Sequence, residues 1–273
     1  MMYTLFKRPL VILCLLGIST LVLAHEFWLY PADFFPKIGQ KLAFSINVGE
    51  DYVGERWGGG ERRVTRLGHL SIQGEENLLP KIRQGNEGVE VPEVEITQAG
   101  TQMIVVETNN SFIELAPDKF TDYLKEDGLD IALRYREQNG ETQKNGRELY
   151  RRCAKTILQV GNQYNDFSTR PVGSVLEILP IQNPYNLKGK PLTCRFLYEG
   201  KPLQNALTRC WRRVNGKTEV ELKRTNQRGE ATFTLPQKGK AAYMVSVVQM
   251  VRLTNNPQAD WQSTWGSMTF GLK

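Results

Sequence analysis

The sequence is poor in histidine, which limits the metal sites and catalytic centres that it can form. Only His25 and His69 occur among its 273 residues. A site built from three or more histidines of one chain is therefore excluded. Any serine–histidine or cysteine–histidine nucleophile would have to use one of these two rings, and the sequence places no partner beside either.

Familiar catalytic motifs are also missing. The chain has no Gly-x-Ser-x-Gly elbow, no phosphate-binding P-loop, no His-Glu-x-x-His and no Cys-x-x-Cys. We therefore expect a protein that is not an enzyme. Two enzymatic alternatives stay open on sequence alone. One is a glycoside hydrolase, because the spatial pairing of two carboxylates is invisible in a sequence. The other is a copper monooxygenase that combines an N-terminal histidine with His69.

Blocks of like charge are absent. The formal net charge is +6 at pH 7, from 35 lysines and arginines against 29 acidic residues that are interleaved with them. No basic run is threaded with aromatic residues and no zinc-finger spacing occurs, so a nucleic-acid partner is not expected.

Long apolar runs are confined to the beginning of the chain. Lys7 and Arg8 precede an almost unbroken apolar stretch, residues 11–23, which the small Ala24 closes. This is the arrangement of a cleaved secretory signal. A membrane anchor needs roughly 18–20 apolar residues, and this stretch is shorter. A lipoprotein signal has small residues before its cysteine, whereas Cys14 follows the bulky Ile12 and Leu13. We expect residues 1–24 to be removed and the mature protein to lie in the periplasm.

Cleavage after Ala24 makes His25 the first residue of the mature chain. Its free α-amine and its imidazole would together form a chelate for a soft or borderline divalent metal ion. The removed segment carries two positive charges and no acids, so the formal charge of the mature protein falls from +6 to +4.

Cysteine is scarce as well. Loss of Cys14 with the signal leaves Cys153, Cys194 and Cys210, an odd number that leaves at least one thiol unpaired. Cys194 and Cys210 lie on strands that we expect to be neighbours around a turn at Gly200, which makes them candidates for a disulfide. Three buried thiols are the alternative.

Alternation of polar and apolar residues predicts β structure over most of the chain. In the first part, the expected strands are 27–31, 41–49, 64–72, 91–96 and 101–107. In the last part, they are 175–180, 192–198, 206–214, 218–224, 230–235, 241–251 and 267–272. Asn215-Gly216 predicts a type I′ hairpin turn. Short strands separated by glycine and proline are typical of a β-sandwich.

Helices are expected between the two β regions. Residues 117–139 begin with Pro117 and carry apolar residues at helical spacing, and Gly128 divides them into two short helices. Residues 146–158 are interpreted as a further helix. Its basic residues are expected to form a solvated face rather than an anion site: Arg147, Arg151, Arg152 and Lys155.

The predicted fold class is mainly β, with two β-sandwich units of immunoglobulin or transthyretin type and a short helical pair between them. The composition of residues 161–174 is that of a linker, and we place a domain boundary near Arg170. The expected organisation is a signal peptide over 1–24, an N-terminal β domain with a helical insertion over 25–170, and a C-terminal β-sandwich over 171–273.

Several motifs, specific only as a set, resemble one family of exported proteins. They are the start Ala24-His25-Glu26-Phe27-Trp28-Leu29, Gly39 with Val48-Gly49-Glu50, and the segments 120–129, 150–155, 179–184 and 260–270. The mature chain is similar over nearly its whole length to the NikM-like periplasmic component of nickel and cobalt uptake, a domain of unknown function. The resemblance implies an exported two-part β protein that hands nickel or cobalt to an inner-membrane transporter.

The candidate ligands for a nickel, cobalt or copper ion are His25, His69, Glu26 and Glu50. Amine and imidazole donors suit these ions better than they suit calcium. Glu50 belongs to a polar segment punctuated by glycine, where binding groups are commonly displayed, and Asp51 and Glu55 add further oxygen donors. Two plainer interpretations stay open: His69 is a strand histidine with its hydrogen bonds satisfied, and the acidic residues solvate a loop.

Two aromatic features have alternative interpretations. Trp57-Gly58-Gly59-Gly60 is either a lid or carbohydrate-stacking point or a simple connection between strands. Trp261 and Trp265 are either a ligand platform or buried anchors of the last strand.

The sequence therefore predicts an exported periplasmic protein that binds nickel or cobalt and supports its uptake. The alternative is a non-catalytic envelope module whose partner is a glycan or an envelope protein.

Overall fold

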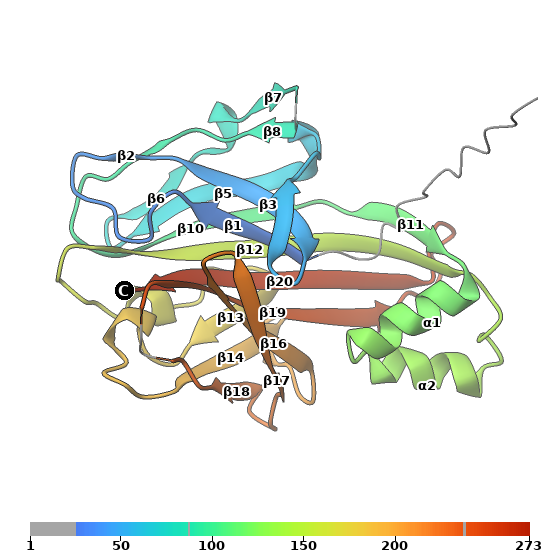
Figure 1. Ribbon diagram of the computed structural model, residues 1–273. Helices are drawn as coiled ribbons and strands as arrows, with labels where there is room; N and C mark the ends of the chain where they lie inside the picture. The colour runs from blue at the N-terminus through green and yellow to red at the C-terminus, as the bar shows by residue number, and fades with distance from the viewer. Residues whose placement is uncertain (1–25, 87, 237–238) are drawn as a thin grey trace, which may run out of the picture.

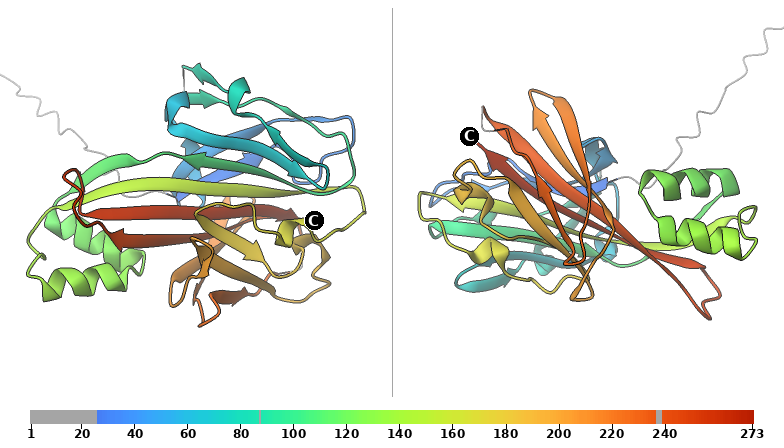
Figure 2. Two further views of the ribbon diagram at one scale, coloured as in Figure 1. Left: turned by 180° about the vertical axis from the view of Figure 1, so that it is seen from behind. Right: turned by 90° about the horizontal axis from the view of Figure 1, so that it is seen from below.

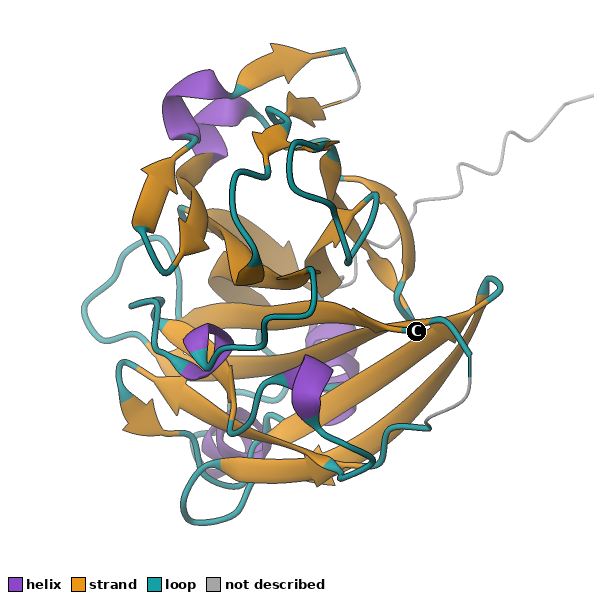
Figure 3. Cartoon of the chain, turned by 90° about the vertical axis from the view of Figure 1, so that its left-hand side faces the viewer, coloured by secondary structure: helices purple, strands orange, loops and turns teal. Residues whose placement is uncertain are grey.

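A computed structural model describes residues 26–86, 88–236 and 239–273, and it is mainly β with a β-sandwich-like arrangement, as the alternation predicts. A nine-stranded sheet runs through the centre, and smaller sheets pack against it (Figure 1). Figure 3 shows these layers from the side.

The central sheet takes strands from both the first and the last part of the chain. In spatial order its strands are β17 (Lys217–Arg224), β16 (Leu207–Val214), β19 (Ala241–Arg252), β20 (Trp261–Leu272), β12 (Gly146–Val160), β10 (Gly100–Thr108), β5 (Val64–Ser71) and β6 (Gly74–Asn77), with β11 (Ser111–Leu115) paired to β12. Among the described strands, β12 and β20 form the one parallel pair, and they join the two parts of the chain.

The two faces of the central sheet bury different side chains, because successive residues of a strand point to opposite faces. Ile104 and Val106 face the sheet formed by β1 (Glu26–Pro31), β3 (Phe44–Glu50) and β4 (Val53–Arg56). Met103 and Val105 face the sheet formed by β13 (Leu176–Pro180), β14 (Leu192–Tyr198), β15 (Lys201–Pro202) and β18 (Glu230–Phe233). The middle of the central sheet, as at β10, is therefore buried on both sides.

Short elements complete the described chain. Two small ladders pair β2 (Lys41–Leu42) with β9 (Val94–Glu95), and β7 (Arg83–Gly85) with β8 (Gly88–Glu90). The 3-10 turns are η1 (Glu61–Arg63), η2 (Leu79–Lys81), η3 (Phe167–Thr169) and η4 (Pro184–Asn186). Asn215 and Gly216 both have positive φ, 50° and 78°, which agrees with the predicted type I′ turn between β16 and β17.

The helices α1 (Pro117–Glu126) and α2 (Asp130–Gln138) confirm the prediction for residues 117–139, including its division at Gly128. They cover one end of the central sheet (Figure 2). Phe120 and Tyr123 pack there against Trp261 and Trp265, which are both buried, so the two tryptophans do anchor the last strand. No helix in the described ranges is long and apolar enough to cross a membrane.

The helix expected over residues 146–158 is wrong, because these residues form β12, a strand of 15 residues. Leu149, Cys153 and Ile157 recur every four residues, and that spacing places side chains on one face of a helix and equally on one face of a strand. The basic residues therefore do not share a solvated face. Lys155 is buried, and the side chain of Arg152 points to the opposite face of the sheet.

The candidate disulfide between Cys194 and Cys210 is not formed in the structure, where Cys153, Cys194 and Cys210 are all buried free thiols, as the alternative interpretation has it. Cys194 lies in β14 and Cys210 in β16, and these strands belong to different sheets rather than pairing with each other. Both thiols pack in the apolar layer between the two sheets, as small apolar residues do.

Candidate functional site

A hollow of about 170 Å³ lies where the first described strand begins, and we call it the acidic hollow. It is lined by Glu26, Gly49, Glu50, Asp51, Tyr123, Glu126, Asp127, Arg209, Trp211 and Trp265. These residues come from β1, the β3–β4 hairpin, α1, β16 and β20, so the hollow forms only when distant parts of the chain fold together.

The β3–β4 hairpin supplies one wall. Glu26 pairs with Gly49 across β1 and β3, which sets Glu50 and Asp51 just beyond the pair. Asp51 and Tyr52 both have positive φ, 54° and 58°, as in a type I′ turn. The buried Tyr52 ring packs edge-on against Trp28 with 5.5 Å between centroids, and this contact holds the strained turn in place. A Cβ at Gly49 would lie 2.2 Å from the carbonyl oxygen of Val53, so the hairpin requires glycine there.

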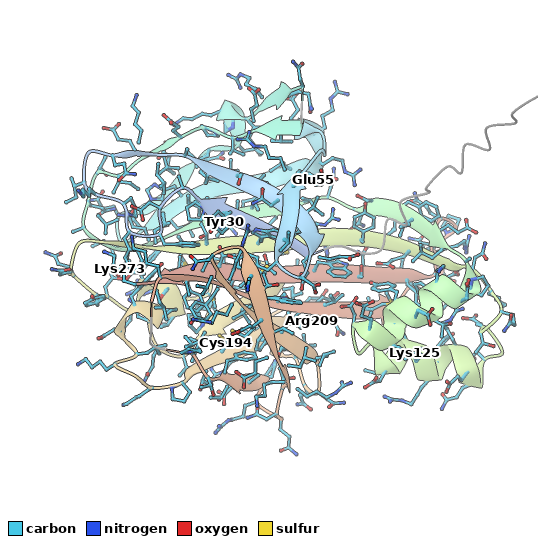
Figure 4. All side chains as sticks on the ribbon, in the orientation of Figure 1. Tyr30, Glu55, Lys125, Cys194, Arg209 and Lys273 are labelled. Atoms are coloured by element: carbon cyan, nitrogen blue, oxygen red, sulfur yellow. The ribbon has the colours of Figure 1, made fainter. Side chains whose placement is uncertain are left out.

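The end of α1 supplies the opposite wall. Asp127 caps the helix, and Gly128 with φ of 63° then turns the chain away. Arg209, labelled in Figure 4, donates from β16 to Asp127 Oδ1 at 2.8 Å and to the carbonyl oxygen of Glu126 at 2.7 Å. Both side chains of this ion pair are largely buried, at 12% and 9% exposure.

Glu26 carries an incompletely satisfied carboxylate. Its Oε1 accepts hydrogen bonds from Trp211 Nε1 at 2.7 Å and from Ser246 Oγ at 3.2 Å. Its Oε2 is buried and has no hydrogen-bond partner among the described residues. Burial raises the pKa of Glu26 to about 7, although Arg209 acts in the opposite direction. A nearby cation would favour the charged form of this carboxylate.

Two further buried acidic side chains, Asp127 and Glu148, have raised pKa values. Burial raises the pKa of Asp127 to about 6 despite its contact with Arg209. Tyr123 OH donates to Glu148 Oε1 at 3.3 Å, and Ser263 Oγ also donates to that oxygen. Burial raises the pKa of Glu148 to about 7.

Acidic side chains outnumber basic ones in the wall of the acidic hollow. Among the described residues, five acidic side chains line it against one arginine, and that arginine is already paired with Asp127. An arrangement of this charge favours a cation over an anion.

The structure brings together two of the predicted ligands, Glu26 and Glu50, which line the same hollow. His25 lies outside the described residues. His69 lies in a separate pocket of about 550 Å³ that shares no lining residue with the acidic hollow. Its Nε2 is 2.6 Å from Gln102 Oε1, and burial lowers the pKa of its ring.

Sequence reasoning missed Asp127, Arg209 and Glu148. Asp127 and Arg209 are 82 residues apart in the chain, and no local pattern links them. The one local signal was the helix end at Gly128, which marks Asp127 as a capping residue but not as part of a site.

No group of three or more His, Cys, Asp or Glu side chains within the described ranges is arranged to hold a metal ion. A complete metal site at the acidic hollow would therefore need donors from outside those ranges. What the described residues offer is a negatively charged wall with one buried, unsatisfied carboxylate oxygen.

Comparison with known proteins gives one strong match. The sequence model of a family described as a domain of unknown function (DUF4198) matches residues 22–250. A search of curated proteins finds no match.

Likeness to solved structures is weak. A tetra-tandem repeat in the extending region of a large adhesion protein has 7% identity and a TM-score of 0.23, with 90% of this chain and 49% of that chain covered. Dimeric latent PorU from Porphyromonas gingivalis has 10% identity and a TM-score of 0.20, with 91% and 20% covered. This chain thus spans less than half the length of either, and neither likeness carries an argument.

Proposed function

This chain belongs to the family described as a domain of unknown function, DUF4198, and from that premise we propose that it is an exported protein that binds a divalent transition-metal ion and supports its uptake. The ion is the cargo of the protein rather than a catalytic cofactor. The sequence resemblance to the periplasmic component of nickel and cobalt uptake favours those two ions.

One observation supports this proposal above the others. The carboxylate of Glu26 presents, at the acidic hollow, a buried oxygen that has no hydrogen-bond partner in the part of the chain that the structure describes. A buried carboxylate gains stability from a cation, and the surrounding charge favours one. Glu50, the other acidic ligand predicted from sequence, lines the same hollow.

The residue that precedes Glu26 supplies the nitrogen donors. His25 is joined to Glu26 by a peptide bond, so its Cα is about 3.8 Å from that of Glu26. Cleavage after Ala24 would leave the α-amine and imidazole of His25 beside the negative wall. An amine, an imidazole and one or two carboxylates form a donor set suited to Ni(II), Co(II) or Cu(II).

Delivery of the ion requires a partner. The resemblance implies an inner-membrane metal transporter, and the proposal places the protein in the periplasm, where it would load and release the ion.

The proposal is tested by titrating Ni(II), Co(II) and Cu(II) into the cleaved protein by calorimetry. We expect dissociation constants in the micromolar range or below for at least one ion. One alanine added before His25 should weaken binding at least tenfold, because it removes the α-amine from the chelate. Glu26→Gln should also weaken binding, whereas Glu55→Gln, on β4 but outside the hollow, should not. Unchanged binding by the extended protein would contradict the proposed chelate.

A second candidate function rests on a different surface. β17 is an edge strand of the central sheet, and its Val220 and Leu222 are exposed apolar side chains. Such an edge can pair with a strand of another protein, which suits a non-catalytic envelope interaction module. Negligible metal content after purification from both nickel-replete and chelated media would favour this alternative.

A further inference from the structure

A second hollow, of about 560 Å³, lies on the other side of β1 and has the opposite charge. Its lining includes Arg62, Arg63 and Arg152 together with Trp57 and Tyr150, and we call it the arginine hollow. Glu26 points toward Trp211, while the next residue, Phe27, packs against Trp57, since successive side chains of a strand point to opposite faces.

The loop that carries two of the arginines is held in place by one asparagine. Asn109 Oδ1 accepts a hydrogen bond from Arg63 Nε at 3.1 Å, and its Nδ2 donates to the carbonyl oxygen of Arg62 at 3.1 Å. The backbone N–H of Asn109 also donates to the carbonyl oxygen of Arg63 at 2.9 Å. These three bonds fix η1 beside the hollow.

Arg152 enters the hollow from β12, where its guanidinium packs against aromatic rings and feels the charge of the buried Glu148 on the same strand. Its guanidinium lies 4.8 Å from the centroid of the Tyr150 ring and 5.3 Å from that of Phe27. Its Nε is buried and has no hydrogen-bond partner within residues 26–86, 88–236 and 239–273. Burial lowers the pKa of Arg152, and the neighbouring charge of Arg63 acts in the same direction.

Arginines outnumber acidic side chains in the described lining of this hollow. None of its three arginines forms an ion pair with a described residue, and Glu61 is the one described carboxylate in the lining. By contrast, Arg66 on the neighbouring β5 is paired with both Glu75 and Glu107. Guanidinium groups that line one hollow without an ion-pair partner are suited to bind an oxyanion, often through two parallel hydrogen bonds.

We propose that the arginine hollow binds the oxyanion group of a sugar-sized ligand, such as a phosphorylated, sulfated or carboxylated sugar. The three arginines recognise the oxyanion. The remaining volume, which is far larger than one phosphate, accepts the body of the ligand beside Tyr150 and the loop at Gly58–Gly60. This gives a function to the Trp57-Gly58-Gly59-Gly60 motif, which the sequence leaves open between a binding role and a plain connection.

The glycine motif fits this role geometrically. A Cβ at Gly59 would lie 2.1 Å from the indole ring of Trp57, so only glycine lets the loop pass this close to that ring. A Cβ at Gly58 would meet no atom within 4 Å, which leaves open space on the side of the loop where that Cβ would project.

The test is calorimetric titration of the cleaved protein at low ionic strength with glucose 6-phosphate, glucuronate, inorganic phosphate and glucose. We expect glucose 6-phosphate or glucuronate to bind at submillimolar concentration, inorganic phosphate to bind more weakly, and glucose not to bind. Binding should weaken as salt is added, because it depends on charge.

The decisive variant is the double substitution Arg62→Gln and Arg63→Gln, which should weaken binding at least tenfold. Arg152→Gln should abolish binding. Because the Arg152 side chain packs on two aromatic rings, the circular dichroism spectrum of this variant must first match that of the wild type, which shows that the variant is folded. Arg83→Gln is the matched control, since Arg83 adjoins the lining residue Gln84 but bonds backbone carbonyls outside the hollow. Equal binding by the wild type and the folded double variant, or no binding of either anionic sugar, would overturn the proposal. Chelation of metal with EDTA should leave this binding unchanged, which separates it from the function proposed above.

Discussion

Glu148 shows how one buried side chain can make stability depend on pH. It is 1% exposed, and its Oε2 has no hydrogen-bond partner in the described ranges, although Oε1 accepts bonds from Tyr123 and Ser263. Burial raises the pKa of Glu148 from 4.5 to about 7. Between those values the folded protein keeps the proton that the unfolded chain has released. The free energy of unfolding contributed by this group therefore falls as the pH rises through that window.

Glu148→Gln should remove this dependence, because an amide has no charge to bury. Relative to the wild type, the free energy of unfolding of the variant should rise by roughly 2–3 kcal/mol between pH 5 and pH 8. Urea denaturation at both pH values measures this difference, with the exposed Glu137→Gln as the control. A difference between variant and wild type that is the same at pH 5 and pH 8 would contradict the prediction.

The three buried cysteines should be chemically silent in the folded protein. Burial raises the pKa of Cys153 to about 11 and that of Cys194 to about 12, so little reactive thiolate forms at neutral pH. We expect Ellman's reagent to modify Cys153, Cys194 and Cys210 only after unfolding in urea. Rapid modification of native protein, or only one reactive thiol after unfolding without reductant, would show that these cysteines are not buried free thiols.

At this scale the sequence predicts part of the acidic hollow. Glu26 and Glu50 are recognisable because one adjoins the expected chain end and the other follows a strand in a glycine-punctuated segment. Arg209 and Asp127 are not recognisable, because they meet only when β16 packs beside the end of α1. The local pattern of a sequence indicates secondary structure. The ion pair of Asp127 with Arg209, 82 residues further along the chain, depends instead on how the whole chain folds.

Among the elements, β14 and β12 show which strands can be predicted from the sequence and which cannot. A strand in which buried and partly exposed residues alternate is predictable from its sequence. β14 is one, and its bounds are the predicted 192–198. β12 is buried on both faces over residues 153–160, so its apolar residues do not alternate with polar ones. A strand buried on both sides is difficult to distinguish from a helix by its periodicity.

The packing of α1 against the start of β12 gives an element-scale prediction. A Cβ at Gly146 would lie 2.1 Å from Cγ of Phe120, a residue that is fully buried under the helix. Gly146→Ala should therefore lower the free energy of unfolding by about 1–3 kcal/mol, the usual cost of overpacking. Urea denaturation monitored by tryptophan fluorescence measures the loss.

Gly58→Ala is the control for this substitution. A Cβ at Gly58 meets no atom within 4 Å, so stability should change by only a few tenths of a kcal/mol. Equal stability of the Gly146 variant and the wild type would mean that Phe120 does not lie against the start of β12.

For the whole molecule, the parallel pair of β12 and β20 is the decisive feature. β20 has twelve residues and ends at Leu272, next to the last residue. It pairs with β12 through nine residue pairs, from Glu148 with Trp261 to Thr156 with Thr269. Ser267 and Thr269 of the same strand donate to backbone carbonyls of β1, at Phe27 and Leu29. The last strand, β20, thus packs with β12 and β1, which belong to the first part of the chain. No local sequence pattern predicts this pairing, because it joins residues 113 positions apart.

Such a sheet should make the protein unfold as one unit. Loss of the C-terminal strands would expose the edge of β12 and uncover the apolar layers on both faces, so neither part gains stability by remaining folded alone. We expect differential scanning calorimetry of the cleaved protein to show one transition, with a calorimetric enthalpy equal to the van't Hoff enthalpy. A fragment of residues 25–170 should lack a cooperative transition of its own and should aggregate. Two resolved transitions, together with a stably folded fragment, would instead mean that the parts before and after Arg170 are independent domains and that the β12–β20 pairing contributes little to stability.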